Sequence, residues 1–389
     1  MGTRLDCISC GREFDCGSQW KCSCGGILEV KHDFDELRNA RRLFDSRLGH
    51  QDVPDSSGVW RFKELIHPLV SREKIISRGE GNTRLYSSSP VDSFAGVKVR
   101  LKHDGENPTG SFKDRGMTVG VSEAVRQGAN AVACASTGNT SSSLAAYAAM
   151  AGLRCKVFIP KGKVSTGKLA QTRAYGAEVA EVEGNFDSAM KLVQESAQDA
   201  GLYLLNSVNP WRIEGQKSVA FEIFQQLIWN APDWICLPAG NLGNTSAVGK
   251  AISEAMEIGL IDKKPRIASV QAHGAKPFYD MWKSGSAELV ASAEPHTVAS
   301  AIQIGNPVNW KKAMRAIRET NGVVADVTDD EIMAAKKVID RSGIGCEPAS
   351  AASVAGAKKL VAEGVIGKDE SVVCILTGNI LKDTAACAL

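Results

Sequence analysis

Short apolar runs alternate with longer stretches of helical periodicity from about residue 97 to the end of the chain. Apolar runs of about four to eight residues are typical of strands, and uninterrupted ones are typical of buried parallel strands. Strands are expected at 97–101, 131–135, 156–159, 178–182, 202–205, 234–237, 267–271 and 372–376, with helices between them, one of these at about 140–151. This alternation predicts an α/β fold with open, mostly parallel twisted sheets flanked by helices.

One lysine follows a turn of small and polar residues in the stretch from Asn107 to Gly116, NPTGSFKDRG. The apolar residues after Lys113 recur at the spacing of one buried helical face: Met117, Val121, Ala124 and Val125. Since Thr109 and Ser111 are residue types that cap helix starts, Lys113 is expected in a first helical turn. The helix dipole there favours a neutral amine that attacks a carbonyl or forms a Schiff base. The alternative is an ordinary solvated lysine.

Two of the expected strands end in glycine-rich loops. The strand at 131–135 continues into STGNTS at 136–141, and the strand at 234–237 continues into PAGNLGNT at 238–245. Ligands bind beyond the carboxyl ends of parallel strands, and glycines at a helix start free backbone amides to face one anion. The second loop is therefore a candidate phosphate cradle, with a plain Gly-Asn turn as the alternative. It has neither the Walker lysine nor the spacing of a dinucleotide loop.

A lysine on rigid structure, a phosphate cradle and no nucleotide motif together favour a phosphorylated carbonyl cofactor. Pyridoxal 5'-phosphate meets all three conditions. The strand at 372–376 ends in Thr377 and Gly378, and a hydroxyl at that place is suited to hydrogen-bond a buried ring nitrogen.

Five of the 11 cysteines lie in the first 24 residues. Cys7 and Cys10 form one close pair, and Cys22 and Cys24 form a second, each followed by glycine, as in a small zinc ribbon. We predict a structural zinc-ribbon-like segment at 7–26 with these four cysteines as ligands, followed by a strand at 27–30. The alternatives are a site that has lost its metal, a reduced cysteine cluster and a redox pair of thioredoxin type, which lacks the usual βαβ context.

Composition narrows the function classes. With 389 residues, of which 43% are hydrophobic, the chain is long enough for two or three domains. Lys and Arg number 46 against 44 for Asp and Glu, so no overall field attracts nucleic acid or an anionic membrane. Neither a signal peptide nor an apolar run of about 18 residues is recognisable, which favours the cytoplasm.

The motifs together resemble a known family. Residues 107–116, 136–140, 240–244 and 377–378 follow the order seen in the fold-type II pyridoxal-phosphate enzymes. Three further stretches resemble the threonine synthases: NSVNPWRIEGQK at 206–217, ASAIQIGNP at 299–307 and CEPAS at 346–350. The resemblance covers roughly residues 60–389, and 43–60 is similar to the N-terminal region of plant-type members. It implies two sheets, with an N-terminal segment at 1–60, a large cofactor-binding domain at 61–118 and 206–389, and a small α/β domain at 119–205.

The resemblance also implies residue roles. Lys113 would hold the cofactor as a Schiff base and later move protons as general base and acid. The other cofactor contacts would be Asn139 at the ring hydroxyl oxygen, Gly240, Asn241, Leu242, Gly243 and Asn244 at the phosphate, and Thr377 at the pyridine nitrogen. The substrate O-phospho-L-homoserine would be held by Ser136, Thr137 and Asn139 at its carboxylate, and by Asn206, Ser207, Arg212 and, more weakly, Lys217 at its phosphate. Thr140 would position a hydroxyl or a water near Cβ.

The implied reaction is a β,γ-elimination and replacement that yields L-threonine and phosphate. Cα and then Cβ lose a proton, phosphate leaves Cγ, water adds at Cβ and Cγ is reprotonated. A hydroxyl at the ring nitrogen does not enforce a protonated pyridine, so the substrate phosphate would assist proton transfer. The planar fork of Arg212 matches a phosphate in two-point fashion.

Two positions depart from the family pattern. Asn379-Ile380 stands where members usually have His-Gly, and Arg84 stands where proline usually follows Asn-Thr. Neither the role of that histidine nor activation by S-adenosylmethionine is therefore carried over.

Three rival functions stay open at this point. They are a related enzyme acting on another phospho-amino acid, such as a cysteate synthase, a threonine dehydratase, and a catalytically silent member that uses the ribbon as a contact surface. The set Asn206, Ser207 and Arg212 favours a phosphorylated substrate and counts against the dehydratase. A silent member would have no physical need for the complete cofactor set. The resemblance is compatible with a homodimer.

Overall fold

The computed structural model describes residues 2–34, 37, 39–161, 166–183, 192–193 and 202–387. The chain divides into two compact units, Met1–Asn82 with Lys113–Ser218 and Thr83–Phe112 with Val219–Leu389. The division into three parts expected from the sequence stays a prediction. The helix expected between 182 and 202 falls largely outside the described residues.

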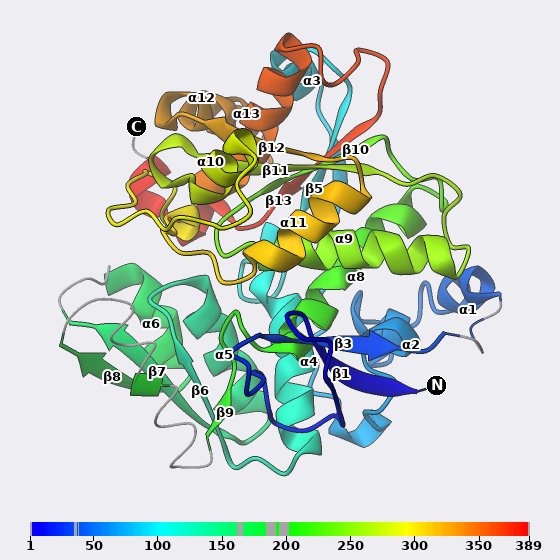
Figure 1. The fold of residues 1–389 in the computed structure, drawn as a ribbon, viewed down its shortest axis with the longest axis vertical. Coiled ribbons are helices and arrows are strands. Elements are labelled where there is room, and N and C mark those ends of the chain that lie inside the picture. The colour runs from blue at the N-terminus through cyan, green and yellow to red at the C-terminus, as the bar shows by residue number, and fades with distance from the viewer. Residues whose placement is uncertain are drawn as a thin grey trace. The chain divides into compact units, whose positions relative to one another are not determined.

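The first unit begins with a three-stranded antiparallel sheet in the order β2-β1-β3 (Figure 1). Its strands are β1 Thr3–Cys7, β2 Glu13–Phe14 and β3 Leu28–His32. The register of β1 on β3 pairs Cys7 with Leu28 and Thr3 with His32. The strand expected at 27–30 is thus confirmed within two residues, and we call residues 3–32 the ribbon.

The main sheet of the first unit has four parallel strands in the order β8-β7-β6-β9. Its strands are β6 Ala131–Ala135, β7 Arg154–Pro160, β8 Glu178–Val182 and β9 Tyr203–Leu204. The helices of this unit are α1 Ala40–Ser46, α2 Lys63–Ile66, α4 Lys113–Arg126, α5 Asn139–Met150, α6 Thr166–Ala174 and the first part of α8 Pro210–Gln226. Apolar residues of α4 and α5 pack on β6 and β7 to form one core. Because every residue of β6 is small or medium-sized and buried, both faces of the strand accept close packing.

The second unit is built on six strands in the order β12-β11-β10-β13-β5-β4, all parallel except the edge strand β4. The strands are β4 Leu85–Ser87, β5 Val99–His103, β10 Trp234–Pro238, β11 Arg266–Ala272, β12 Val323–Val327 and β13 Val372–Leu376. The helices are α3 Ser89–Ala95, α9 Gly243–Glu257, α10 Pro277–Ser284, α11 Trp310–Glu319, α12 Asp329–Arg341, α13 Pro348–Ala362 and the end of α8. In Figure 1, α12 and α13 lie on one side of this sheet and α9 and α11 on the other.

Helix α13 packs closely against the sheet of this unit because its residues are mostly small. Most of its length is alanine, serine and glycine, and a Cβ at Gly356 would lie 2.5 Å from a methyl carbon of Val270 on β11. Small residues allow the helix axis to approach the sheet closely. The predicted α/β architecture with two mostly parallel sheets is therefore confirmed. Among the described helices, none has both the length and the apolar character needed to cross a bilayer.

Candidate active site

Lys113 is the first residue of helix α4, as predicted, and its side chain is half-buried. The next residue, Asp114, is fully buried and accepts a hydrogen bond of 2.5 Å from the Ser143 hydroxyl on α5. This contact joins the starts of two helices that follow the lysine turn and the STGNTS loop. The lysine is therefore held on rigid structure, as the sequence indicated.

The loop at 136–140 turns directly from β6 into α5, and all five residues are half-buried. The Gly138 amide donates to the Ser136 hydroxyl at 3.2 Å, and the Ser141 hydroxyl donates to the Gly138 carbonyl at 2.8 Å. These bonds organise the loop from within. The structure thus places Ser136, Thr137, Asn139 and Thr140 on one short segment of the same unit as Lys113.

Arg212 lies in the first turn of α8 with 1% of its surface exposed. Within the described part of the chain, neither Nε nor Nη1 of Arg212 has a hydrogen-bond partner. Burial lowers the pKa of Arg212 to about 10, so the guanidinium is still charged at neutral pH. A buried cation with two unsatisfied donors is costly unless an anion reaches it, and a phosphate group offers several acceptor oxygens to such a cation.

Asn206 differs in its surroundings from the prediction. Its Oδ1 accepts from the Ala135 amide at 3.0 Å and its Nδ2 donates to the Ala135 carbonyl at 2.9 Å. Both ends of the amide therefore hold the segment after β9 to the end of β6. Ser207 beside it is half-buried, and a phosphate contact by either residue stays a prediction.

Lys217 is completely buried and already has two partners. Its Nζ lies 2.5 Å from Oε2 of Glu214 and donates to the Leu65 carbonyl at 2.8 Å. Sequence reasoning could not see these partners, because Leu65 is 152 residues away along the chain. The contacts give the ammonium a structural role, and its weak assignment to the substrate stays a prediction.

Helices α4 and α8 approach each other through glycines. A Cβ at Gly116 would lie 2.9 Å from the Arg212 carbonyl oxygen, and one at Gly215 would lie 1.9 Å from the Arg115 carbonyl oxygen. Any side chain at Gly215 is thus excluded by backbone. This seam was not expected from the sequence, although Gly116 and Gly120 are spaced by one helical turn in α4.

In the second unit, β10 leads through the PAGNLGNT loop into α9. Leu242 has a positive φ of 62° and α9 begins at Gly243, so the loop presents backbone amides at the start of a 15-residue helix. The Asn244 side chain is buried, and neither its Oδ1 nor its Nδ2 has a partner among the described residues. Amides at a helix start together with an orphaned buried Nδ2 fit the phosphate of pyridoxal 5'-phosphate. A Cβ at Gly240 would lie 3.2 Å from the Ala301 carbonyl oxygen, which favours glycine there.

Thr377 follows β13 and is buried. Its hydroxyl lies 3.2 Å from the Ser350 hydroxyl and donates to Oε1 of Glu347 at 3.4 Å, while the Gly378 amide donates to Ser350 at 2.9 Å. Because Glu347 accepts a hydrogen bond from the Thr377 hydroxyl, the Thr377 oxygen is free to accept a further hydrogen bond. Glu347 and Ser350 are supporting residues to which the sequence analysis gave no role, although both lie in the CEPAS motif.

The turn before Lys113 is bonded to the segment after Thr377. The Phe112 amide donates to the Thr377 carbonyl and the Asn379 amide donates to the Gly110 carbonyl, both at 2.9 Å. Gly110 has a φ of 85°, which explains the glycine in the motif. Asn379, where the family pattern has histidine, also accepts from the Leu381 amide at 3.0 Å and so caps a short helical turn.

Arg84, the second departure, has a backbone reason. Its amide donates to Oε2 of Glu106 at 2.8 Å. A proline at this position has no N–H and would lose that bond.

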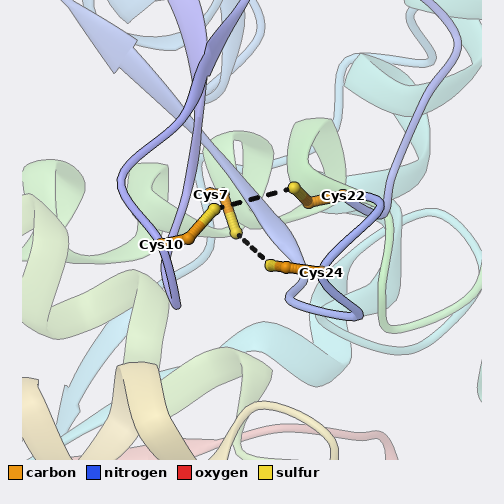
Figure 2. A group of neighbouring side chains, drawn as sticks. All are labelled: Cys7, Cys10, Cys22 and Cys24. Carbon is orange, nitrogen blue, oxygen red and sulfur yellow. Dashed lines mark hydrogen bonds between the residues drawn. The ribbon is translucent and has the colours of Figure 1, made fainter.

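Figure 2 shows the four ribbon cysteines facing one another. Their sulfur atoms all lie within 4.8 Å of one another, with Cys7 and Cys24 at 3.5 Å and Cys10 and Cys22 at 3.8 Å. Four thiolates at 2.3 Å from a tetrahedral zinc ion would be about 3.8 Å apart, so the cluster fits that ion. The described residues offer four protein ligands and leave no open position for catalysis.

Comparison with known proteins places the chain. A family model described as pyridoxal-phosphate dependent enzyme matches residues 76–378, and the chain therefore belongs to that family. The solved structure of maize serine racemase superposes with a TM-score of 0.67 at 22% identity, covering 83% of this chain and 92% of that one, which supports the fold.

Among curated sequences, the chain is 47% identical over 383 residues to threonine synthase of Methanocaldococcus jannaschii, covering 98% of this chain and 93% of the relative. It is 48% identical over 383 residues to threonine synthase of Methanosarcina acetivorans, covering 97% and 92%. Within the pyridoxal-phosphate dependent enzymes, the chain belongs to the threonine synthases.

Proposed function

We propose that the protein converts O-phospho-L-homoserine and water into L-threonine and phosphate, with pyridoxal 5'-phosphate as its cofactor. The observation that carries the choice of substrate is Arg212, a buried guanidinium with two unsatisfied donors in the first turn of α8. A phosphate monoester supplies the anion that this site lacks. A substrate with only a hydroxyl in that place, as a dehydratase would take, leaves the charge buried and unpaired.

The cofactor, when bound, draws electrons from the substrate and so makes its carbon-bound hydrogens acidic. The helix start at Gly243 and the Asn244 amide would hold its phosphate, and Thr377, oriented by Glu347, would hydrogen-bond the pyridine nitrogen. Asn139 would contact the ring oxygen from the start of α5. Gly243, Asn244, Thr377 and Asn139 are residues that the family resemblance indicates.

Lys113 would take the protons from Cα and then Cβ of the substrate, and the electron pair left at Cβ would expel phosphate from Cγ. After phosphate has left, Lys113 would return a proton at Cγ and, once water has added at Cβ, a proton at Cα. Its place at the start of α4 is fixed by the bond from Ser143 to the neighbouring Asp114. Arg212 would keep the departing phosphate charge paired, and Thr140 would direct the water that adds at Cβ. Ser136 and Thr137 would hold the substrate carboxylate with hydroxyl groups from the loop before α5.

The test supplies O-phosphohomoserine and O-phosphoserine separately and measures phosphate release together with threonine. We expect release from the first substrate with threonine as product. Release from O-phosphoserine alone would favour a cysteate synthase-like enzyme and overturn the proposal. Lys113→Ala should lose the visible absorbance of the covalently held cofactor, whereas no such absorbance in the wild type after cofactor addition would indicate a silent member.

We also propose that Cys7, Cys10, Cys22 and Cys24 bind one structural zinc ion. The support is the fit of the four sulfur positions to tetrahedral coordination and the presence of two buried and two exposed thiols around one point. The cytoplasmic location, the homodimer and the absence of a nucleic-acid partner stay predictions from the sequence.

A further inference from the structure

The ribbon touches helix α8 through one buried histidine. His32 is the last residue of β3, and its side chain is fully buried. Its Nε2 lies 2.9 Å from Oε2 of Glu214, a carboxylate with 1% of its side chain exposed. Glu214 stands two residues after Arg212 on α8. None of the steps proposed above uses this pair.

Both ring nitrogens of His32 have a hydrogen-bonding partner. Nδ1 of His32 lies 3.1 Å from the Thr3 hydroxyl on the neighbouring strand. A neutral ring with its proton on Nε2 donates to Glu214 and accepts from Thr3, so both contacts are satisfied without a charge on the histidine. The charge of Glu214 is balanced by Lys217, whose ammonium also donates to the Leu65 carbonyl. His32 thus adds a directed bond to a carboxylate that is already neutralised.

The ribbon also contacts the helix that begins with Lys113. Arg126 and Gln127, at the end of α4, each donate to the Cys16 carbonyl at 3.1 Å. Inside the ribbon, the pairing of β1 with β3 places Cys7 opposite Leu28 and Thr3 opposite His32. The four cysteines of Figure 2 therefore belong to the same small sheet and its loops as His32, the residue that contacts Glu214.

We propose that His32 is a positioning residue for the reaction, acting on Arg212 through Glu214. The cysteine ribbon holds β3, β3 holds His32, and His32 fixes the carboxylate in the first turns of α8, so that Arg212 keeps the orientation in which it binds phosphate. The inference rests on the proposed function, because it takes Arg212 as the substrate phosphate ligand. It assigns the ribbon a part in substrate affinity that is distinct from its part in stability.

The test compares His32→Leu, His32→Gln and Lys31→Gln in the cofactor-loaded enzyme. Glutamine can place its Nε2 near the histidine Nε2 and keep the bond to Glu214. Lys31 lies on the same strand, its side chain is 41% exposed and its Nζ lies 3.0 Å from Oε1 of the nearby Glu29, so its variant is the matched control. The readouts are the Kd of inorganic phosphate by calorimetry, KM and kcat with O-phosphohomoserine, and Tm. Loading with the cofactor keeps its own phosphate site from taking the probe.

We expect His32→Leu to raise the Kd of inorganic phosphate and the KM together by roughly tenfold or more, with kcat changed less than about twofold, as is typical when a supporting residue is lost. His32→Gln should recover most of the affinity, and Lys31→Gln should leave it unchanged. A lower Tm in His32→Leu with an unchanged Kd would make the histidine merely structural and overturn the inference.

If His32→Leu does not fold, Thr3→Val replaces it, because it removes only the bond that orients Nδ1. A rise in the phosphate Kd of about twofold to threefold then supports the inference, and an unchanged Kd overturns it. Wild-type enzyme that neither binds inorganic phosphate nor releases it from O-phosphohomoserine would overturn the proposed function itself. That outcome differs from a normal wild type with an unaffected variant, which would overturn only the role of His32.

Discussion

A Cβ atom at Gly120 would lie 3.3 Å from Cγ of Arg212. The aliphatic stem of the arginine therefore runs across the glycine, on the helix that begins with Lys113. One turn earlier, Gly116 faces the backbone of the same arginine. The two residues proposed to carry the chemistry, Lys113 and Arg212, are thus set relative to each other by a glycine seam within one unit.

Gly120→Ala is expected to displace Arg212 and to strain the core. The new methyl group would also meet Cδ2 of Leu205 at 2.5 Å, so side chains on α8 and after β9 must shift. Overpacking of this kind costs about 1–3 kcal/mol of unfolding free energy, and the KM for the phosphorylated substrate should rise. Denaturant unfolding and phosphate release would measure the two effects.

Gly367→Ala is the control for that substitution. Gly367 is exposed, and its Cβ would lie 3.4 Å from Oε2 of Glu370, an ordinary contact. The unfolding free energy of the Gly367→Ala variant should stay within about 0.5 kcal/mol of that of the wild type. If Gly120→Ala behaved like this control in both assays, the seam would not position Arg212.

Arg212→Met should stabilise the protein while it abolishes threonine formation. The buried guanidinium leaves Nε and Nη1 without partners when no anion is bound, and methionine of similar length removes both donors. We expect a gain of about 1–3 kcal/mol in unfolding free energy in phosphate-free buffer. Added inorganic phosphate should raise the Tm of the wild type and leave that of the variant unchanged.

Arg115→Met separates this effect from the loss of any buried arginine. Arg115 is also fully buried, but its Nη1 donates to the Ser218 hydroxyl at 3.1 Å. Its replacement should therefore destabilise the protein. Destabilisation of the Arg212 variant to the same extent would show that the guanidinium is satisfied by the protein and does not await an anion.

The sequence predicted strands β6 and β8 well because their signal is local. The fully buried run 131–135 is strand β6, and 178–182 is β8, with the expected bounds. The strand expected at 97–101 is found at 99–103, since Lys102 and His103 are buried polar residues that continue the strand beyond its apolar pattern. Strand β12 was not predicted, because Asp326 interrupts its short apolar run. The Asp326 carboxylate contacts Lys359 and His273, which only the fold brings close to it.

The site was predictable in its motifs and not in its supports. Lys113 starts a helix and Thr377 follows a strand, as their sequence motifs predicted, and the roles of these residues in the site stay predictions. Glu347, Glu214 and His32 act through partners up to 182 residues away, and such pairs leave no local period or spacing. The same reason hides the bond from Lys217 to the Leu65 carbonyl, 152 residues away, and the assignment of Lys217 to the substrate stays a prediction.

Stability should fall as the pH drops below about 6.5, and His67 should account for part of the loss. His67 is buried, stacks on Trp211 with 3.9 Å between ring centroids, and lies 2.8 Å from Oε2 of Glu123. Burial lowers the pKa of His67 below its usual value of 6.5, despite the opposing effect of Glu123. Just below pH 6.5, His67 therefore binds a proton in the unfolded chain but stays neutral in the folded protein. Lowering the pH through this range favours unfolding.

Denaturant unfolding at pH 8 and at pH 5.5 would measure the contribution of His67 to this loss of stability. We expect His67→Gln to reduce the difference in unfolding free energy between the two pH values. His50→Gln is the control, since His50 is half exposed and 3.8 Å from Asp55. The range above pH 5 keeps Glu123 out of the comparison, because hydrogen bonds from His67 and Arg126 outweigh burial and lower its pKa below 4.5. An equal pH dependence in wild type and His67→Gln would contradict the prediction.

Metal content should distinguish Cys10 from Cys16, two cysteines six residues apart in the ribbon. Cys10 belongs to the cluster of four sulfur atoms, whereas Cys16 lies outside it and donates to the Thr3 carbonyl at 3.4 Å. Protein purified without chelators should hold about one zinc per chain, a fully protein-ligated structural ion. Cys10→Ser should lose the zinc and lower Tm, because metal binding at such a site adds directly to folding stability. Cys16→Ser should keep the zinc, and equal zinc loss in both variants, or none in the wild type, would mean that the four thiols do not form the site.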